Sequence, residues 1–176
     1  MLCVSLFSGC GGLDIGISNA GFDVVLANDN DVCCRDSYLA NRPGATFHLG
    51  SVNELTESVL RGYLGSDLNC IDLLAGGPPC PPFSKSRFYR KDKPRGIDDS
   101  TGWETISGFF DVLAIIRPRA FLLENVPGMD YKVHSDALDY AISRASDLGY
   151  RCWKKVISAA NYGVPQIREC FFGWAN

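Results

Sequence analysis

The chain has 176 residues and a formal net charge of −3, with 46% hydrophobic and 21% charged residues. This length favours one domain with a sizeable core, and the composition is that of a soluble globular protein. No apolar run approaches the roughly 20 residues that span a bilayer, so the sequence argues against a membrane protein. The acidic balance argues against a stand-alone DNA-binding module, which is usually basic, although it leaves room for a local basic patch.

The cysteines and histidines also restrict the class of protein. Eight cysteines are present, but the chain is too long and too apolar to need a disulfide scaffold, so we expect reduced thiols in a cytoplasm. No CxxC pair occurs, and His48 and His134 fit no ligand spacing, so no metal site is predicted. The amino terminus lacks a basic segment before its apolar run and is typical of a first strand, not of a signal peptide.

Apolar runs of strand length alternate with longer amphipathic stretches along the whole chain. In chain order, we expect a strand at 3–7, a helix at 13–20, strand 23–27, helix 31–41, strand 46–49, helix 53–63, strand 71–75, helix 103–116, strand 120–123, helix 135–148, and strands 151–158 and 170–174. This alternation predicts an α/β fold with a doubly wound, mostly parallel, Rossmann-like sheet in a single domain, 1–176. Ligands of such sheets bind outside the carboxyl ends of the strands.

A glycine-rich turn, Phe-Ser-Gly-Cys-Gly-Gly at 7–12, follows the first strand. Glycine lets the backbone turn sharply and approach a ligand. Asp29 follows Gly9 by 20 residues at the end of the second strand, where a carboxylate can accept hydrogen bonds from ribose hydroxyls. The crowded glycines match a dinucleotide fingerprint poorly, so S-adenosylmethionine fits better than NAD. The alternative is a tight turn beside an ordinary surface aspartate.

The most specific segment is Gly-Gly-Pro-Pro-Cys-Pro-Pro-Phe-Ser at 76–84. Its four prolines fix the backbone around Cys80 and remove amide donors, so the segment is neither a central strand nor a helix interior. It forms a stiff ledge for one thiol, and a thiolate is the strongest nucleophile among common side chains. We therefore interpret Cys80 as a catalytic nucleophile, with a structural cysteine as the alternative.

A basic stretch follows at 85–95, with six basic residues, one acidic residue and interleaved aromatics. Such a stretch beside a presented thiol favours a loop that closes over a phosphate backbone. A solvated charged loop is the alternative.

Two polar side chains border the last strands. Glu124 follows four apolar residues, and partial desolvation there favours its protonated form, which can donate a proton to a ring nitrogen. Arg168 borders the start of the last strand, where it can orient Glu124 or bind an anionic substrate group. The alternatives are a carboxylate that caps the next segment or pairs with an arginine, and a surface arginine.

Together these motifs resemble those of the DNA cytosine carbon-5 methyltransferases. Residues 7–12 are similar to that family's cofactor motif, and 77–80 to its catalytic loop. Residues 124–126 are similar to its acidic motif, and 166–169 to its arginine motif. The motifs stand in the family's order over nearly the whole chain. The expected segments are the cofactor motif at 3–30, the catalytic loop at 76–101, the acidic motif at 120–128, and the arginine motif with the last strand at 161–174.

The resemblance implies transfer of a methyl group from S-adenosylmethionine to carbon 5 of a flipped-out cytosine in double-stranded DNA. It implies that Cys80 attacks carbon 6 and that Glu124 steadies or protonates ring nitrogen 3, with Arg168 completing the catalytic set. It also implies a set of residues near the cofactor: Phe7, Ser8, Gly9, Cys10, Gly11, Gly12, Leu13, Asp29, Asn30, Ser51, Val52 and Pro79.

The chain departs from the family's pattern at several places. Cys170 stands where a second arginine is usual, Ser51 where an acidic residue reads the adenine amino group, and Asn30 where an aromatic residue is common. The target-recognition region and the last two motifs are absent from the 176 residues. These departures predict a catalytic fragment or split subunit, in a restriction-modification or epigenetic setting, that needs a partner chain to read DNA.

Two other functions stay open. A degenerate chain would bind S-adenosylmethionine or a protein partner without methyl transfer, and Cys170 and Ser51 favour this reading. A tRNA cytosine methyltransferase is the other, because relatives of the family use the same motifs on RNA. For the leading hypothesis, the expected location is a bacterial cytoplasm or nucleoid.

Overall fold

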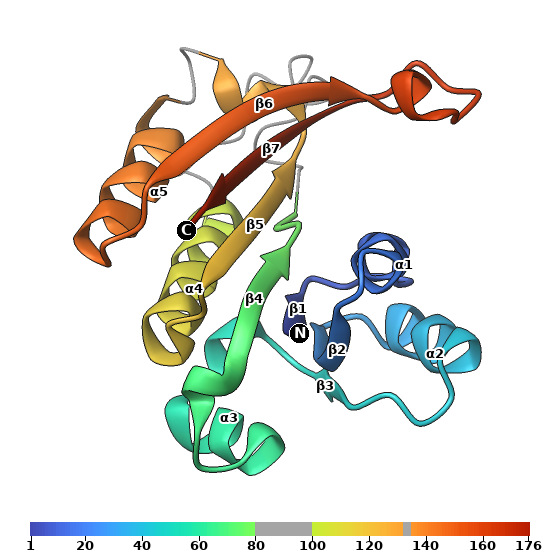
Figure 1. Ribbon diagram of the computed structural model, residues 1–176, viewed down its shortest axis with the longest axis vertical. Helices are drawn as coiled ribbons and strands as arrows, with labels where there is room; N and C mark the ends of the chain where they lie inside the picture. Colours follow the sequence, from blue (N-terminus) through green and yellow to red (C-terminus); the bar gives the residue numbers. More distant parts are fainter. Residues whose placement is uncertain (80–99, 132–134) are drawn as a thin grey trace.

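The computed structural model describes residues 1–79, 100–131 and 135–176. In these ranges, one seven-stranded sheet has the strand order β3-β2-β1-β4-β5-β7-β6 (Figure 1). Its strands are β1 (Leu2–Leu6), β2 (Asp23–Asp29), β3 (Phe47–Leu49), β4 (Ile71–Gly76), β5 (Ala120–Asn125), β6 (Cys152–Ser158) and β7 (Glu169–Ala175). The chain order reverses direction between β1 and β4, and such a switch point is where ligands of doubly wound sheets bind.

Strand direction decides which residues share an edge of the sheet. Strands β1 to β5 pair in parallel, whereas β7 pairs antiparallel with both β5 and β6. The carboxyl ends of β1 to β5 therefore meet the first residues of β7 at one edge. This arrangement confirms the predicted doubly wound, mostly parallel α/β sheet.

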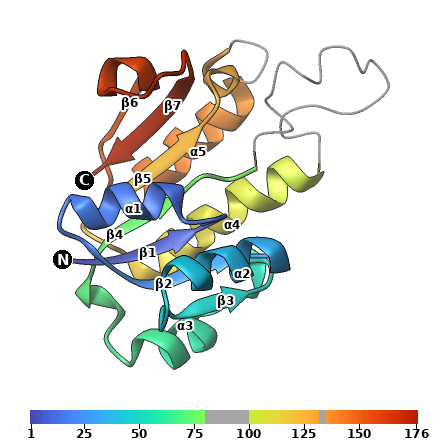
Figure 2. The ribbon, with the colours of Figure 1, turned by 90° about the vertical axis from the view of Figure 1, so that its right-hand side faces the viewer.

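Helices cover both faces of the sheet (Figure 2). Helices α1 (Gly12–Asn19) and α2 (Val32–Asn41) lie on one face, and α3 (Glu57–Leu64), α4 (Ser100–Ile116) and α5 (Ser135–Asp147) on the other. The core follows from the two-residue period of a strand. In β1, Val4 and Leu6 pack in the larger core with α4, whereas Cys3 packs with Ile17 of α1. Fully buried Phe109 of α4 sits edge-on to Phe121 of β5 in the larger core.

The expected helix at 53–63 is wrong, because this stretch holds two shorter elements. A 3₁₀ helix, η1 (Val52–Glu54), is followed by α3, and the two are separated at Thr56. Thr56 has extended backbone dihedrals, and its Oγ1 accepts a hydrogen bond from the Val59 N–H, so it caps α3. A threonine in this role starts a new helix instead of continuing the old one. The other expected elements are present, and each of their ends lies within three residues of the expected one.

The described part of the chain contains no helix long and apolar enough to cross a bilayer. Nor does it contain a group of three or more histidine, cysteine or acidic side chains placed to hold a metal ion.

Candidate active site

The glycine-rich turn joins β1 to α1 at the carboxyl edge of the sheet. Its backbone is left-handed at Phe7, Gly9 and Gly11, with φ of 54°, 53° and 89°. Glycine adopts these angles without strain, but Phe7 pays a conformational cost because its Cβ crowds the backbone. A strained residue persists only where its surroundings hold it, and such residues cluster at functional sites.

Asp29, at the end of β2, fastens this turn. Its Oδ2 accepts a hydrogen bond from the Gly9 N–H at 2.9 Å, and its Oδ1 accepts one from the Asp31 N–H at 3.0 Å. The Ser8 N–H donates to the Asn28 carbonyl at 2.9 Å. A carboxylate has about four lone-pair positions, so the two backbone bonds leave capacity for further donors.

The segment after β3 forms another part of the candidate site. The fully buried Asn28 side chain donates from Nδ2 to the carbonyls of His48, at 3.1 Å, and Gly50, at 2.9 Å. Ser51 and Glu54 form a reciprocal capping box at the start of η1, and Val52 is buried. The candidate adenine-side residues, Ser51 and Val52, therefore lie in a segment tied to β2 through Asn28.

One side of the turn is open, as a bound nucleoside cofactor would require. A Cβ built on Gly9 or Gly12 would meet no heavy atom within 4 Å, so the turn faces open space there. Cys10 and Asn30 are exposed beside it. Gly11 differs, because a Cβ there would lie 3.1 Å from the Tyr38 ring. The turn thus has an open side at Gly9 and a closed side packed on α2.

We expect Gly11→Ala to lower the free energy of unfolding by about 1–2 kcal/mol, because alanine disfavours the left-handed backbone. The added methyl would also crowd Tyr38. Gly12→Ala is the matched control, since Gly12 lacks a positive φ and its Cβ direction is open. Urea unfolding checks both variants, and an equal effect of the two substitutions would contradict this reading of the turn.

Glu124 lies against Gly77, which directly follows β4. A Cβ on Gly77 would sit 3.0 Å from the Glu124 Oε2, so a larger residue there would push on the end of this half-buried carboxyl. The buried Asn125 side chain donates from Nδ2 to the Pro78 carbonyl at 3.2 Å. The tip of β5 therefore holds the chain just before Pro79. Cys80 and the basic stretch 85–95 lie outside the described residues.

Cys170 connects the acidic motif with the arginine motif. Burial raises the pKa of the Cys170 thiol, a hydrogen bond with Arg168 opposes this rise, and a hydrogen bond with Glu124 adds to it. The register explains the contact, because Glu124 pairs with Phe172, and Cys170 lies two residues earlier on the same face of β7. The thiol is thus within interaction range of both the Arg168 and the Glu124 side chains.

The candidate residues form two adjacent groups on one edge of the sheet. The turn, Asp29 and the Ser51–Val52 segment form the first, and Glu124, Cys170 and Arg168 form the second. Leu6 of β1 pairs with Gly76 of β4, which brings the two groups together. Asn28 and Asn125 were not predicted from the sequence as residues that support the site. The one sign of this role in the sequence is an asparagine at the end of an apolar strand.

A doubly wound sheet with a glycine turn, a carboxylate at the end of β2 and an acidic strand tip defines a class of nucleoside-cofactor enzyme folds. Residues 1–175 match the profile of the C-5 cytosine-specific DNA methylases. The chain therefore belongs to this family, which is a family of transferases.

Individual relatives agree with this assignment. The chain is 34% identical to the Type II methyltransferase M.SacI of Streptomyces achromogenes over 96% of its own length and 46% of the relative. It is also 34% identical to M.AquIA of a Picosynechococcus strain, covering 69% of that protein. A solved structure described as a DNA modification methyltransferase of an E. coli prophage has a TM-score of 0.82 and 30% identity, with 99% of this chain and 46% of that chain covered.

The Dnmt2 methyltransferase of S. pombe shares the fold with a TM-score of 0.73 at 20% identity, over 100% of this chain and 50% of that chain. The chain spans about half the length of most of these relatives.

Proposed function

We propose that the chain supplies the catalytic part of an enzyme that transfers a methyl group from S-adenosylmethionine to carbon 5 of cytosine in double-stranded DNA. One observation carries the proposal: the glycine turn held by Asp29 and the Glu124 carboxyl beside Gly77 lie at the carboxyl ends of β1 and β5, the two strands that flank β4. A methyl donor and an acid for the base are needed within one site, and these tips provide a place for both. Membership of the family supports the same reaction.

The cofactor's role is limited to one step. S-adenosylmethionine, when bound, supplies an electrophilic methyl group. In the proposal, Asp29 accepts hydrogen bonds from the ribose hydroxyls with the lone pairs that Gly9 and Asp31 leave free. Ser51, Val52 and exposed Asn30 border the adenine, and Pro79 borders the methionine part.

The chain's own residues perform the chemistry on the base. The Cys80 thiolate forms a bond to carbon 6 of the flipped-out cytosine, and the ring electrons move toward carbon 5. Glu124 holds or donates a proton at ring nitrogen 3, which stabilises the negative charge that develops there. Carbon 5 then takes the methyl group, so that S-adenosylhomocysteine is the leaving group. Transfer of the carbon-5 proton to water or another base lets the electron pair of the C–H bond re-form the 5,6 double bond, which expels Cys80 as a thiolate.

We further infer that DNA reading needs polypeptide in addition to these residues. The matched relatives are about twice as long as the chain, and its net charge is −3. Base-specific contacts are separate from the chemistry, so they can lie on a companion chain or on a further part of the same protein.

Methyl transfer tests the proposal directly. The protein, alone and with a companion chain that supplies the DNA-reading part, is incubated with labelled S-adenosylmethionine and either duplex DNA or tRNA. We expect label on cytosine in DNA. Label on tRNA alone would replace the proposal with an RNA methyltransferase, and cofactor binding without transfer to either substrate would favour a non-catalytic remnant.

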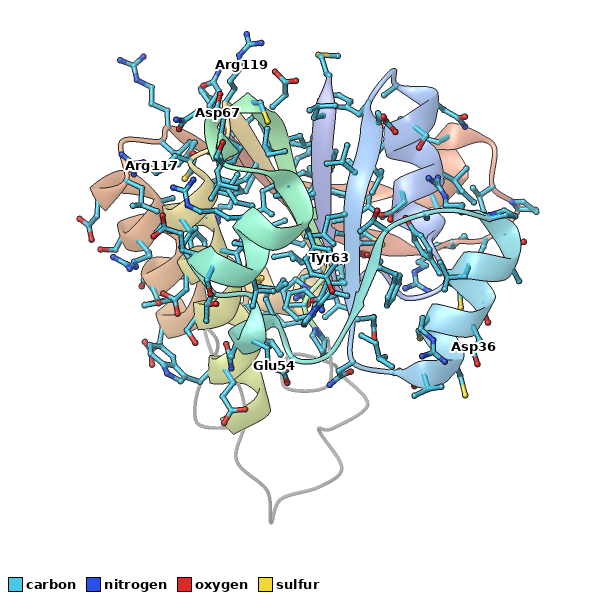
Figure 3. The ribbon with its side chains drawn as sticks, turned by 90° about the horizontal axis from the view of Figure 1, so that it is seen from below. Asp36, Glu54, Tyr63, Asp67, Arg117 and Arg119 are labelled. Atoms are coloured by element: carbon cyan, nitrogen blue, oxygen red, sulfur yellow. The ribbon has the colours of Figure 1, made fainter. Side chains whose placement is uncertain are left out.

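We expect Asp29→Asn to weaken binding of S-adenosylhomocysteine by about 10- to 100-fold. The asparagine side chain has one acceptor oxygen, whereas the carboxylate has two. Asp36→Asn is the matched control. Asp36 lies on the surface of α2, paired with Arg35 at 2.7 Å (Figure 3). Isothermal titration calorimetry measures both variants, and unchanged affinity in Asp29→Asn would remove Asp29 from the ribose site.

A further inference from the structure

Asp14 is a fully buried carboxylate that the proposed reaction does not use. It lies in the first turn of α1, where it accepts hydrogen bonds from Ser5 Oγ at 2.6 Å and from the Tyr38 hydroxyl at 2.7 Å. It is not a helix cap, because the N-cap residue is Gly11 and no side chain caps this end. A buried carboxyl is costly unless hydrogen-bonded, so these two donors are what allow it to remain there.

The hydrogen bonds continue from Asp14 into the glycine-rich turn. The Ser8 hydroxyl has two acceptors within reach of its one hydrogen, Ser5 Oγ at 3.0 Å and the Ser5 carbonyl at 3.1 Å. The Asn28 N–H donates to Ser8 Oγ at 3.3 Å. Ser5 Oγ therefore contacts both the Asp14 carboxylate and the Ser8 hydroxyl, and so links the buried carboxylate to the turn. Ser5, Ser8, Asp14 and Asn28 are all buried, which shields the series from competing water.

Tyr38 brings α2 into the same network. Its side chain is fully buried, and its ring lies where a Cβ on Gly11 would come within 3.1 Å. The Arg42 guanidinium lies 5.7 Å from the ring centroid and also donates to Ser18 Oγ at 3.1 Å. Burial raises the pKa of Tyr38 and its bond with Asp14 raises it further, so the hydroxyl stays a protonated donor.

We propose that the Tyr38–Asp14–Ser5 series is a positioning device that holds the glycine-rich turn in the shape that binds the cofactor. Tyr38 and Asp14 are positioning residues, because they act through Ser8 and Gly11 and touch no substrate. An apolar cluster of the same volume would stabilise the fold as well as a buried charge does. The hydrogen-bonded series differs from such an apolar cluster because both of its ends reach the glycine-rich turn. One end meets the Ser8 hydroxyl, and the other is the Tyr38 ring beside Gly11, whose backbone is left-handed. The inference rests on the proposed cofactor role of that turn.

The test compares two tyrosines that each lose one hydroxyl. Tyr38→Phe removes the donor to Asp14, and Tyr150→Phe removes a donor to the Pro118 carbonyl at 2.6 Å, at the amino end of β5. We expect Tyr38→Phe to weaken binding of S-adenosylhomocysteine roughly tenfold and Tyr150→Phe to leave it within twofold. Both variants are expected to lose similar stability in urea unfolding, so stability loss alone cannot produce the difference in affinity.

A second variant keeps the test sharp if Tyr38→Phe does not fold. Ser5→Ala leaves the Tyr38–Asp14 bond in place but cuts the link to Ser8, and we expect the same roughly tenfold loss of affinity. If the unchanged protein binds S-adenosylhomocysteine and both variants bind it equally well, the positioning role is overturned and the proposed function stands. If the unchanged protein shows no binding, both are overturned together.

Discussion

We expect Cys80→Ser to abolish covalent capture of a duplex that carries 5-fluorocytosine, while the affinity for S-adenosylhomocysteine stays nearly unchanged. Of the substitutions in the site, this one should have the largest effect. Fluorine at carbon 5 cannot leave as the proton does, so the adduct with the thiol persists and is seen as a shifted band on a denaturing gel. A serine hydroxyl is a far weaker nucleophile than a thiolate, so capture should fall to the level seen with ordinary cytosine.

The matched control for this experiment is Cys70→Ser. Cys70 is an exposed free thiol that donates to the Asp67 carbonyl. Figure 3 shows Asp67 at the end of the molecule opposite Glu54, away from the proposed site. Capture by Cys70→Ser should equal that of the unchanged protein. Undiminished capture by Cys80→Ser would remove Cys80 from its proposed role and leave another thiol to be found.

The second large effect concerns Glu124. Glu124→Gln should lower the rate of methyl transfer by about 10²- to 10⁴-fold, because an amide cannot serve as a general acid at ring nitrogen 3. Glutamine has nearly the same shape and fits over Gly77, so the affinity for S-adenosylhomocysteine should change less than twofold. Radiolabelled transfer to DNA measures the rate, and Glu57→Gln, at an exposed ion pair with Arg61, is the control.

The same substitution has a signature that does not depend on activity. The Glu124 carboxylate raises the pKa of the Cys170 thiol, so its removal should move that pKa downward. At a fixed pH near neutrality, Cys170 should then be more often ionised and react faster with iodoacetamide, as followed by peptide mapping. An unchanged alkylation profile in Glu124→Gln would show that the two side chains do not interact in solution.

Much of the fold could be predicted from local sequence patterns. Each strand is a short apolar run and each helix has a periodic apolar face, so their approximate positions followed from residue spacing alone. The break at Thr56 was missed because Asn53 to Tyr63 has helical spacing, and the capping bonds of Ser51 and Thr56 are local side-chain events that periodicity does not register. The antiparallel insertion of β7 between β5 and β6 depends on long-range pairing, which no local pattern encodes.

The candidate site likewise has parts that local sequence patterns predict and parts that depend on long-range strand pairing. The glycine turn and Asp29 could be proposed from the sequence because the turn follows a strand and the aspartate ends the next strand, 20 residues after Gly9. In the structure, Asp29 accepts a hydrogen bond from the Gly9 N–H. The contact of Cys170 with Glu124 was not predicted, because 45 residues lie between them in the sequence and only the register of β5 with β7 brings them together. Asn125 lay next to a predicted residue, but its bond to the Pro78 carbonyl depends on the pairing of β4 with β5.

The last strand in the sequence, β7, lies between β5 and β6, and this position has a consequence for the order in which the protein is made. The turn, Asp29 and the Ser51–Val52 segment are all present once β3 and η1 have been synthesised, whereas the side chains facing Glu124 arrive only with β7. A nascent chain that has not yet reached residue 169 leaves β5 as an unpaired edge strand, with its amide and carbonyl groups open to other chains. Pairing of β7 with β5 therefore covers this exposed edge and also brings Cys170 to Glu124.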